Sequence, residues 1–184
     1  SSLVGSEMCI RDRLEEMEIQ RVVIVSEERN VYLPTLYYAE LNCARMLWDL
    51  NIPLERDEEY AMKQIASLEA QEELELDDQQ RIAVKEAMHS GLLVVTGGPG
   101  TGKTTVEKVI LYIHEKLRGG SVLLMAPTGR ASRRMAECTG CTDASTMHSA
   151  LGLVSEEMES ESCDFLEADL ILVDEMSMVD MRLA

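Results

Sequence analysis

The sequence predicts an α/β fold, in which a parallel sheet with flanking helices is preceded by a small α+β unit. Two observations predict it. Short apolar runs at 92–96, 122–126 and 170–173 alternate with segments of helical period, which is the pattern of βαβ units. The first of these runs is flanked by glycines and is short enough for a buried parallel strand.

The opening residues 1–13, SSLVGSEMCIRDR, give no signal for a regular element. They show neither a period of 2 nor one of 3.6, and they have no capping residues in order. This stretch resembles a translated sequencing-adapter read-through, and the alternative is a natural disordered tail. We therefore leave residues 1–13 out of the fold prediction.

Residues 14–75 are expected to form a separate region made of a hairpin and helices. Strands are predicted at 22–26 and 31–33, and Pro34 is expected to open a helix that runs to about Leu50. An acidic helix is expected from about Asp57 to Glu73. The apolar stripe predicted for the helix that follows Pro34 consists of Leu36, Ala39, Cys43, Met46, Leu47 and Leu50.

Residues 76–184 are expected to form the α/β domain. Asp77 or Asp78 can cap a helix from Gln79 to about His89. Further helices are predicted from Lys103 to Arg118 and from Gly129 to about Glu137, each following one of the apolar runs. This order places a helix after each of the first two predicted strands.

Charge and composition restrict the classes of function that the chain can have. The net charge of −17 argues against nucleic acid for the whole chain, because phosphate contacts need Lys and Arg. Residues 79–150, however, carry nine Lys and Arg against five Asp and Glu, a local balance of +4. No apolar run is long enough to span a membrane, and five cysteines suit a reduced protein better than a disulfide framework. We expect a cytoplasmic protein without a membrane partner.

The stretch from Gly97 to Thr104 matches the pattern G-x-x-x-x-G-K-[ST] in full. Its glycines let backbone N–H groups turn toward phosphate oxygens, and the helix that follows adds the positive end of its dipole. Lys103 is expected to reach the β- and γ-phosphates, and the Thr104 hydroxyl is expected to ligate Mg²⁺. The predicted nucleotide contacts are Gly97, Gly98, Pro99, Gly100, Thr101, Gly102, Lys103, Thr104 and Thr105.

Two adjacent acids follow the last apolar run. Asp174 is expected to hold Mg²⁺ directly or through water, and Glu175 to orient and deprotonate the attacking water. Alone this is a weak pattern, because buried strands often end in acids. Together with the phosphate loop it predicts a hydrolytic ATPase with Lys103, Asp174 and Glu175 as catalytic residues.

Gln80 precedes the phosphate loop in the segment LDDQQRIAV. A glutamine amide offers both an acceptor and donors, which complements the exocyclic amine and N7 of adenine. This predicts that Gln80 selects ATP over GTP. The alternative is an ordinary surface glutamine on a helix.

Candidate DNA contacts lie beyond the second apolar run. Loops at the carboxyl ends of parallel strands are where ligands bind, so Thr128, Gly129 and Arg130 could contact a DNA backbone, with Arg133 and Arg134 nearby. The alternative is an ordinary strand–helix loop with a solvated basic face. Thr146 and His148 form a smaller candidate of the same kind.

Cys138 and Cys141 have the spacing of metal ligands, but no second pair accompanies them in the sequence. Cys163 alone does not complete a four-ligand site. We therefore expect neither a zinc site nor a redox pair.

In combination, the motifs resemble those of the RecD-like (RecD/TraA) branch of superfamily 1 ATP-dependent DNA helicases. LDDQQRIAV resembles the Q motif, GGPGTGKTT motif I, APTGRAS motif Ia, STMHSALG the segment after it, and DEMSMVD motif II. The stretch VYLPTLYYAELNCARML is also similar to what precedes the motor in that branch. Pif helicases share DE-x-SM and T-x-H-S and are the nearest rival, whereas the RNA-directed Upf group usually has a DEA-type motif II.

The resemblance implies a RecA-like P-loop NTPase domain over 76–184, motor domain 1A, preceded by the end of an N-terminal helicase region over 14–75. It implies ATP and Mg²⁺ as cofactors, 5′→3′ movement, and a role in DNA recombination or repair. Single-stranded DNA would lie along Thr128, Gly129, Arg130, Thr146 and His148.

Motifs III to VI and the second motor domain, with its arginine finger, would follow Ala184. Such a finger typically contributes about 10³–10⁵ in turnover. We therefore expect that a polypeptide of these 184 residues binds nucleotide weakly, hydrolyses it slowly and does not unwind DNA. The alternative is a stand-alone ATP-binding module that does not translocate.

Overall fold

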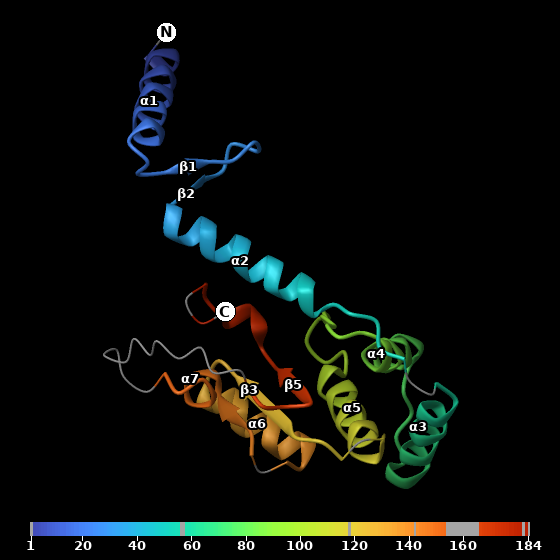
Figure 1. The fold of residues 1–184 in the computed structure, drawn as a ribbon. Helices are drawn as coiled ribbons and strands as arrows, with labels where there is room; N and C mark the ends of the chain where they lie inside the picture. The colour runs from blue at the N-terminus through green and yellow to red at the C-terminus, as the bar shows by residue number, and fades with distance from the viewer. Residues whose placement is uncertain are drawn as a thin grey trace. The chain divides into compact units, whose positions relative to one another are not determined.

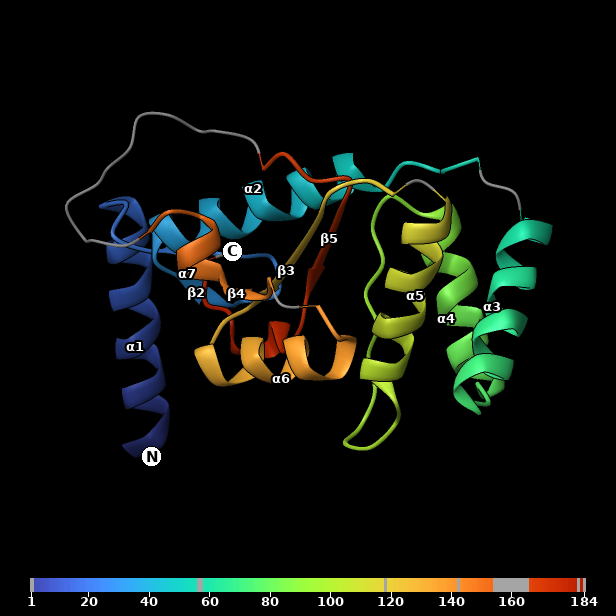
Figure 2. The ribbon, with the colours of Figure 1, turned by 90° about the horizontal axis from the view of Figure 1, so that it is seen from below.

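The computed structural model describes residues 2–55, 58–117, 119–141, 143–153, 166–181 and 183. The chain divides into two compact units, Ser1–Asp49 and Leu50–Leu183 (Figures 1 and 2). Most of the acidic stretch between Glu156 and Asp169, with Cys163, lies outside the described residues. No helix in the described part of the chain has the length and apolar character needed to cross a bilayer.

The first unit contains a hairpin and two helices (Figure 1). Strands β1 (Ile24–Val25) and β2 (Val31–Tyr32) pair in antiparallel register, and α2 (Pro34–Leu50) follows them, so the predicted hairpin and helix are confirmed. Helix α1 (Ser2–Ile19) covers the opening stretch, for which no regular element was predicted. Its first and last turns contain no complementary charges, which explains why the pattern did not indicate a helix.

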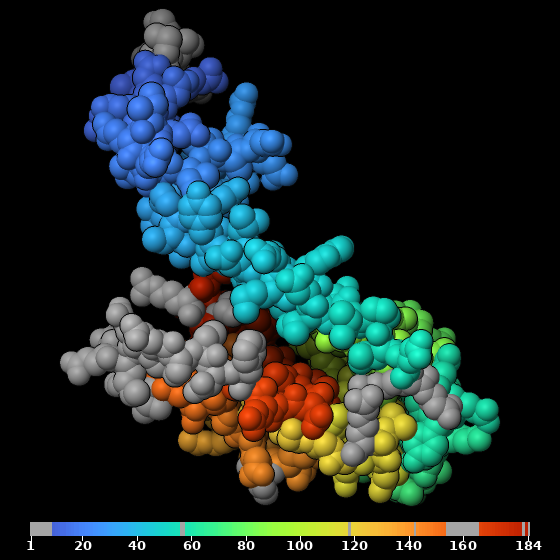
Figure 3. All heavy atoms as spheres, viewed as in Figure 1, coloured from blue at the N-terminus to red at the C-terminus, as the bar shows by residue number. Residues whose placement is uncertain are grey.

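Helix α2 has the predicted bounds but does not bury its apolar stripe. None of its residues is buried, and its side chains are visible at the surface in Figure 3. Leu36 is 41% exposed and Met46 is 65% exposed. A helical stripe becomes core only where another element covers it, so periodicity predicted the helix and not its burial.

In the second unit, three helices pack side by side: α3 (Glu58–Glu72), α4 (Asp78–His89) and α5 (Lys103–Leu117) (Figure 2). Burying one such aliphatic side chain contributes about 1.5–3 kcal/mol, so this packing holds α5 against α3 and α4. The buried core of the three helices and the segment between α3 and α4 consists of Ala61, Ile65, Leu68, Leu76, Val84, Met88, Val106, Val109, Ile110 and Ile113.

The sheet of the second unit has the order β4–β3–β5 and is parallel throughout. Its strands are β3 (Val122–Ala126), β4 (Ser145–Thr146) and β5 (Leu170–Val173). Helices α6 (Gly129–Thr139) and α7 (Met147–Ala150) follow β3 and β4, and a 3₁₀ turn, η1 (Met176–Met178), follows β5. Leu111, Leu124 and Met135 form a second core between α5, β3 and α6. The predicted partial RecA-like α/β fold is confirmed, and the sequence did not indicate β4.

The predicted strand at 92–96 is wrong. Residues 92–98 form no strand, and Val94 is 75% exposed. A strand exists through ladder hydrogen bonds with a neighbour, and an apolar run does not identify that neighbour. Residues 92–96 therefore do not pair with β5, which forms one edge of the described sheet.

Candidate functional site

The glycine-rich loop at 97–102 leads directly into α5, whose first residue is Lys103. Gly100 and Gly102 each have φ +76°, in the left-handed region where a side chain would be strained. A Cβ on Gly102 would also meet the amide end of the Gln80 side chain. The motif therefore needs glycine at 102 for its backbone conformation, and a side chain there would displace the Gln80 amide.

The side chains of this loop bond to the loop itself. Nζ of Lys103 donates to the carbonyl oxygens of Gly97 at 2.7 Å and Gly98 at 3.0 Å. The Thr101 hydroxyl donates to the Gly98 carbonyl at 2.9 Å. Phosphate oxygens would therefore compete with two exposed carbonyls for the Lys103 ammonium group.

The two predicted acids lie immediately beyond β5. The Asp174 N–H donates to the Met125 carbonyl at 3.0 Å, which extends the pairing of β5 with β3 by one bond. The Glu175 N–H donates to Oδ1 of Asp174 at 2.7 Å. Glu175 has φ +53°, a left-handed conformation that costs a non-glycine residue about 1–2 kcal/mol. Such strain is typical of functional turns and sets the direction in which the chain leaves the sheet.

Glu107 connects these groups, although it is not among the predicted site residues. Burial and the nearby charge of Asp174 raise the pKa of Glu107 to about 7, while Lys103 and Arg134 act in the opposite direction. Its Oε2 is buried and accepts no hydrogen bond from any described residue. Lys103 and Glu107 are four residues apart on α5, and this helical spacing was the signal that could have identified Glu107.

These residues fit a magnesium nucleotide. The positive-φ glycines and the start of α5 offer backbone donors, and Lys103 supplies the cation. Thr104 and Asp174 carry hard oxygen ligands. The charges of Asp174 and Lys103 both shift the pKa of Glu107, which lies on α5 with Lys103 and Thr104. In the described ranges, no group of three or more His, Cys, Asp or Glu side chains could hold a metal alone. Mg²⁺ typically needs only one or two carboxylates when substrate phosphates complete its coordination.

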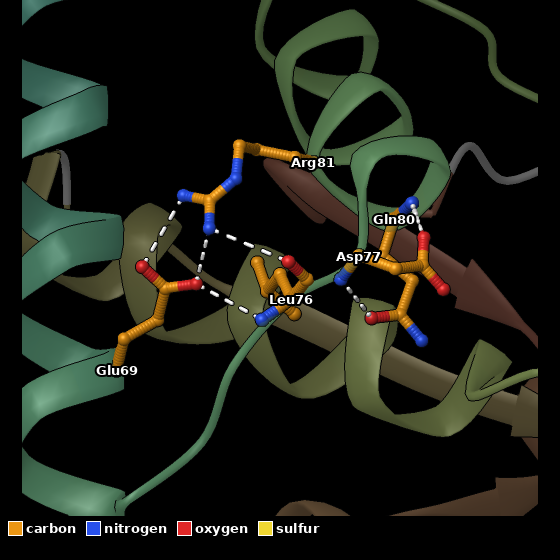
Figure 4. A network of polar contacts seen from close by, with 5 residues as sticks. All are labelled: Glu69, Leu76, Asp77, Gln80 and Arg81. Atoms are coloured by element: carbon orange, nitrogen blue, oxygen red, sulfur yellow. Dashed lines mark hydrogen bonds and ion pairs between the residues drawn. The ribbon is translucent and has the colours of Figure 1, made fainter.

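Gln80 lies in the first turn of α4, with its side chain beside Asp77 (Figure 4). Its N–H donates to Oδ1 of Asp77 at 2.8 Å, and its Oε1 accepts from the Asp77 N–H at 3.0 Å, so the pair forms a capping box. Its Nε2 donates to the Thr101 carbonyl at 3.2 Å. The structure therefore brings Gln80 to the loop. One amide hydrogen and one carbonyl lone pair are left for a ligand.

The candidate DNA contacts gather at the carboxyl ends of β3 and β4. Ala126 pairs with Thr146, and a Cβ on Gly129 would lie 3.9 Å from Cγ2 of Thr146. Oγ1 of Thr128 accepts from the Ala131 N–H, and Oγ1 of Thr146 from the Ser149 N–H, so both threonines cap helices.

The basic residues beside this edge are exposed. Arg130 and His148 both lie at the surface. A shallow hollow on α6 is lined by Gly129, Arg130, Arg133, Arg134 and Glu137. Cys138 and Cys141, near the end of α6, carry free thiols.

Comparison with known proteins identifies the family. Residues 80–184 match the model of the AAA domain. The ATP-dependent RecD2 DNA helicase of Deinococcus radiodurans is 41% identical over 104 residues, which cover 56% of this chain and 14% of the relative. RecBCD enzyme subunit RecD of Buchnera aphidicola subsp. Acyrthosiphon pisum is 26% identical over 178 residues, covering 86% of this chain and 29% of the relative. The same subunit of Haemophilus influenzae is 34% identical over 137 residues, covering 60% and 21%.

The chain thus spans less than a third of the length of each of these three relatives. The matched residues include Gln80, the phosphate loop, and the acids after β5. The chain is similar to the RecD2 helicase and the RecD subunits named above, and it belongs to the AAA domain family.

Proposed function

We propose that the whole protein that contains this chain is an ATP-dependent DNA helicase, which couples Mg-ATP hydrolysis to 5′→3′ movement on single-stranded DNA in recombination or repair. The observation that carries the proposal is the glycine loop that leads into α5. Its left-handed glycines, Gly100 and Gly102, precede Lys103, whose ammonium group lies over the loop carbonyls. The printed names of the relatives, a RecD2 DNA helicase and RecBCD subunits, support DNA as the substrate.

Each residue has a proposed task in the hydrolysis. Bound Mg-ATP supplies a phosphoanhydride bond whose cleavage releases free energy. Lys103 would exchange its bonds to the Gly97 and Gly98 carbonyls for phosphate oxygens. Thr104 and Asp174 would hold the metal, and Glu175 would orient the attacking water and accept its proton. Gln80 would read the adenine edge.

The DNA path is proposed to follow the edge formed by Thr128, Gly129, Arg130, Thr146 and His148. Exposed Arg130 and Arg133 would attract phosphates, so binding is expected to weaken as salt rises. The threonine hydroxyls keep a hydrogen to donate, because each accepts a bond from a helix N–H while capping.

Strand displacement on tailed duplexes tests the proposal. With ATP and Mg²⁺, the whole protein is expected to unwind a duplex with a 5′ single-stranded tail and to leave a 3′-tailed duplex intact. Unwinding of the 3′-tailed duplex alone would show that the proposed direction is wrong. ATP binding with displacement of neither substrate would favour an ATP-binding module that does not translocate.

For a polypeptide of residues 1–184 alone, we expect no strand displacement. The resemblance assigns the arginine finger to a second motor domain, and such a finger contributes about 10³–10⁵ in turnover. An ATPase assay with single-stranded DNA checks this expectation.

A further inference from the structure

An ion pair joins α3 to the start of α4, one residue beyond Gln80 (Figure 4). Nη2 of Arg81 lies 2.7 Å from Oε1 of Glu69, and Nη1 of Arg81 donates to Oε2 of Glu69 at 3.2 Å. The contact is therefore bidentate, which is the geometry that gives an Arg–carboxylate pair directional specificity. The Glu69 side chain is 18% exposed and that of Arg81 is 32% exposed, so the pair is more sheltered than a typical surface pair.

The same two side chains also hold the segment between the helices. Oε1 of Glu69 accepts from the Leu76 N–H at 3.0 Å, and Nη2 of Arg81 donates to the Leu76 carbonyl at 3.4 Å. Leu76 itself is buried in the core of the three helices. The hydrogen bond from Leu76, and then the bond from Arg81, hold the pKa of Glu69 below its ordinary value despite its burial. Glu69 and Arg81 thus bind both polar groups of the Leu76 backbone.

The segment they hold leads directly to the cap of α4. Asp77 follows Leu76, and its exchange of hydrogen bonds with Gln80 fixes the glutamine side chain. From that position Nε2 of Gln80 reaches the Thr101 carbonyl of the phosphate loop. A chain of direct contacts therefore runs from Glu69 through Leu76 and Asp77 to Gln80.

We propose that the Glu69–Arg81 pair is a positioning element for the base site: it sets the Gln80 amide against the phosphate loop and thereby determines the preference for ATP over GTP. The proposal rests on the proposed role of Gln80 in reading adenine. Neither Glu69 nor Arg81 touches the nucleotide in this account. Their loss would misplace one amide while leaving the glycine loop and Lys103 unchanged.

The test measures affinities of the whole protein for ATP, GTP and tripolyphosphate by competition with a fluorescent ATP analogue. Arg81→Gln and Glu69→Ala are expected to reduce the ATP-to-GTP affinity ratio roughly 5-fold, about the value of one net hydrogen bond. Affinity for tripolyphosphate is expected to change by less than about twofold, because it depends on the loop alone. Arg81→Lys, which keeps the charge without the fork, is expected to give an intermediate ratio and remains informative if Arg81→Gln does not fold.

Lys85→Gln is the matched control. The Lys85–Glu58 pair joins the same two helices at 2.5 Å, but Lys85 lies more than a helical turn beyond Gln80 and pairs with Glu58 at the other end of α3 from Glu69. This variant is expected to leave the affinity ratio unchanged. An equal loss for ATP, GTP and tripolyphosphate in the Arg81 variants would mean a general structural role and would overturn the positioning proposal.

Gln80→Ala distinguishes the base-reading role of Gln80 from the positioning role of Glu69 and Arg81. If it lowers the ratio while the Glu69 and Arg81 variants do not, the base-reading role stands and the positioning role is wrong. If Gln80→Ala leaves the ratio unchanged, both the base-reading role and the positioning role are wrong.

Discussion

The phosphate loop and the β3–α6 junction both lead into a helix, but they use their polar side chains differently. In the loop, Lys103 and Thr101 bond to exposed carbonyls of the loop itself. At the junction, the Thr128 hydroxyl accepts from a helix N–H and forms the cap of α6. The first set can exchange its partners for a ligand at little cost to the fold. The second set stabilises a helix before any ligand arrives.

The largest expected effect follows from removing the loop cation. Lys103→Ala is expected to lower ATP turnover about 10²–10³-fold, because the phosphates lose their one positioned ammonium group. The free energy of unfolding without nucleotide is expected to change by less than about 0.5 kcal/mol, because the ammonium group bonds to exposed loop carbonyls that water can satisfy instead. Steady-state ATPase assays and urea unfolding measure the two quantities.

Arg81→Gln provides a second ATPase comparison, because the Arg81 side chain bonds to Glu69 and to the Leu76 carbonyl and not to the phosphate loop. Its turnover at saturating ATP is expected to stay close to that of the wild type.

If Lys103→Ala lost as much stability as a helix-cap variant, the contrast between the phosphate loop and the β3–α6 junction would be wrong.

Glu107 gives the next largest effect. Its pKa of about 7 in the folded protein lies above the ordinary 4.5, so the folded state holds this proton more tightly than the unfolded state. The stability it contributes is complete below about pH 4.5 and is lost as the pH rises through 7. Glu107→Gln is therefore expected to raise the free energy of unfolding at pH 8 by about 1–2 kcal/mol, after discounting for its partial exposure.

Urea unfolding with EDTA at pH 4.5, 6 and 8 checks this, because EDTA removes any metal from Asp174. The gain should shrink as the pH falls and vanish near pH 4.5. A gain that is equal at all three pH values would show that packing, and not ionisation, causes it.

The smallest expected effect concerns the helix caps. Thr128→Ala is expected to lower the free energy of unfolding by about 1 kcal/mol, because the Ala131 N–H loses its acceptor. Thr128→Ser keeps the hydroxyl and should retain both stability and DNA affinity. Urea unfolding and fluorescence anisotropy with a labelled oligonucleotide measure them. Unchanged stability in Thr128→Ala would place Thr128 in the same class as the loop residues.

Elements whose signal is local were predictable from the sequence. Asp77 caps α4 as expected, because a cap needs only a side chain and the N–H groups three residues away. The bounds of β3 and β5 were also predicted, since each is a short apolar run with a partner in the same sheet. The run at 92–96 has the same local pattern but lacks that partner in the structure, and the sequence alone did not distinguish the two cases.

The candidate site shows the same limit. The glycine loop and the acids after β5 were found because each is a contiguous motif. Glu107 was missed, since its pKa is raised by burial and then by the charge of Asp174, and both causes exist only in the folded chain. The Glu69–Arg81 pair was missed for a related reason: it needs α3 and α4 packed together before either residue has a partner.

ATP hydrolysis stimulated by single-stranded DNA tests the central claim most directly. The whole protein should hydrolyse ATP faster when single-stranded DNA is added, and Glu175→Gln should reduce that rate about 10²–10⁴-fold while ATP still binds. A protein that binds ATP but hydrolyses it equally fast with and without DNA would contradict the account, as would a Glu175→Gln variant with the wild-type rate.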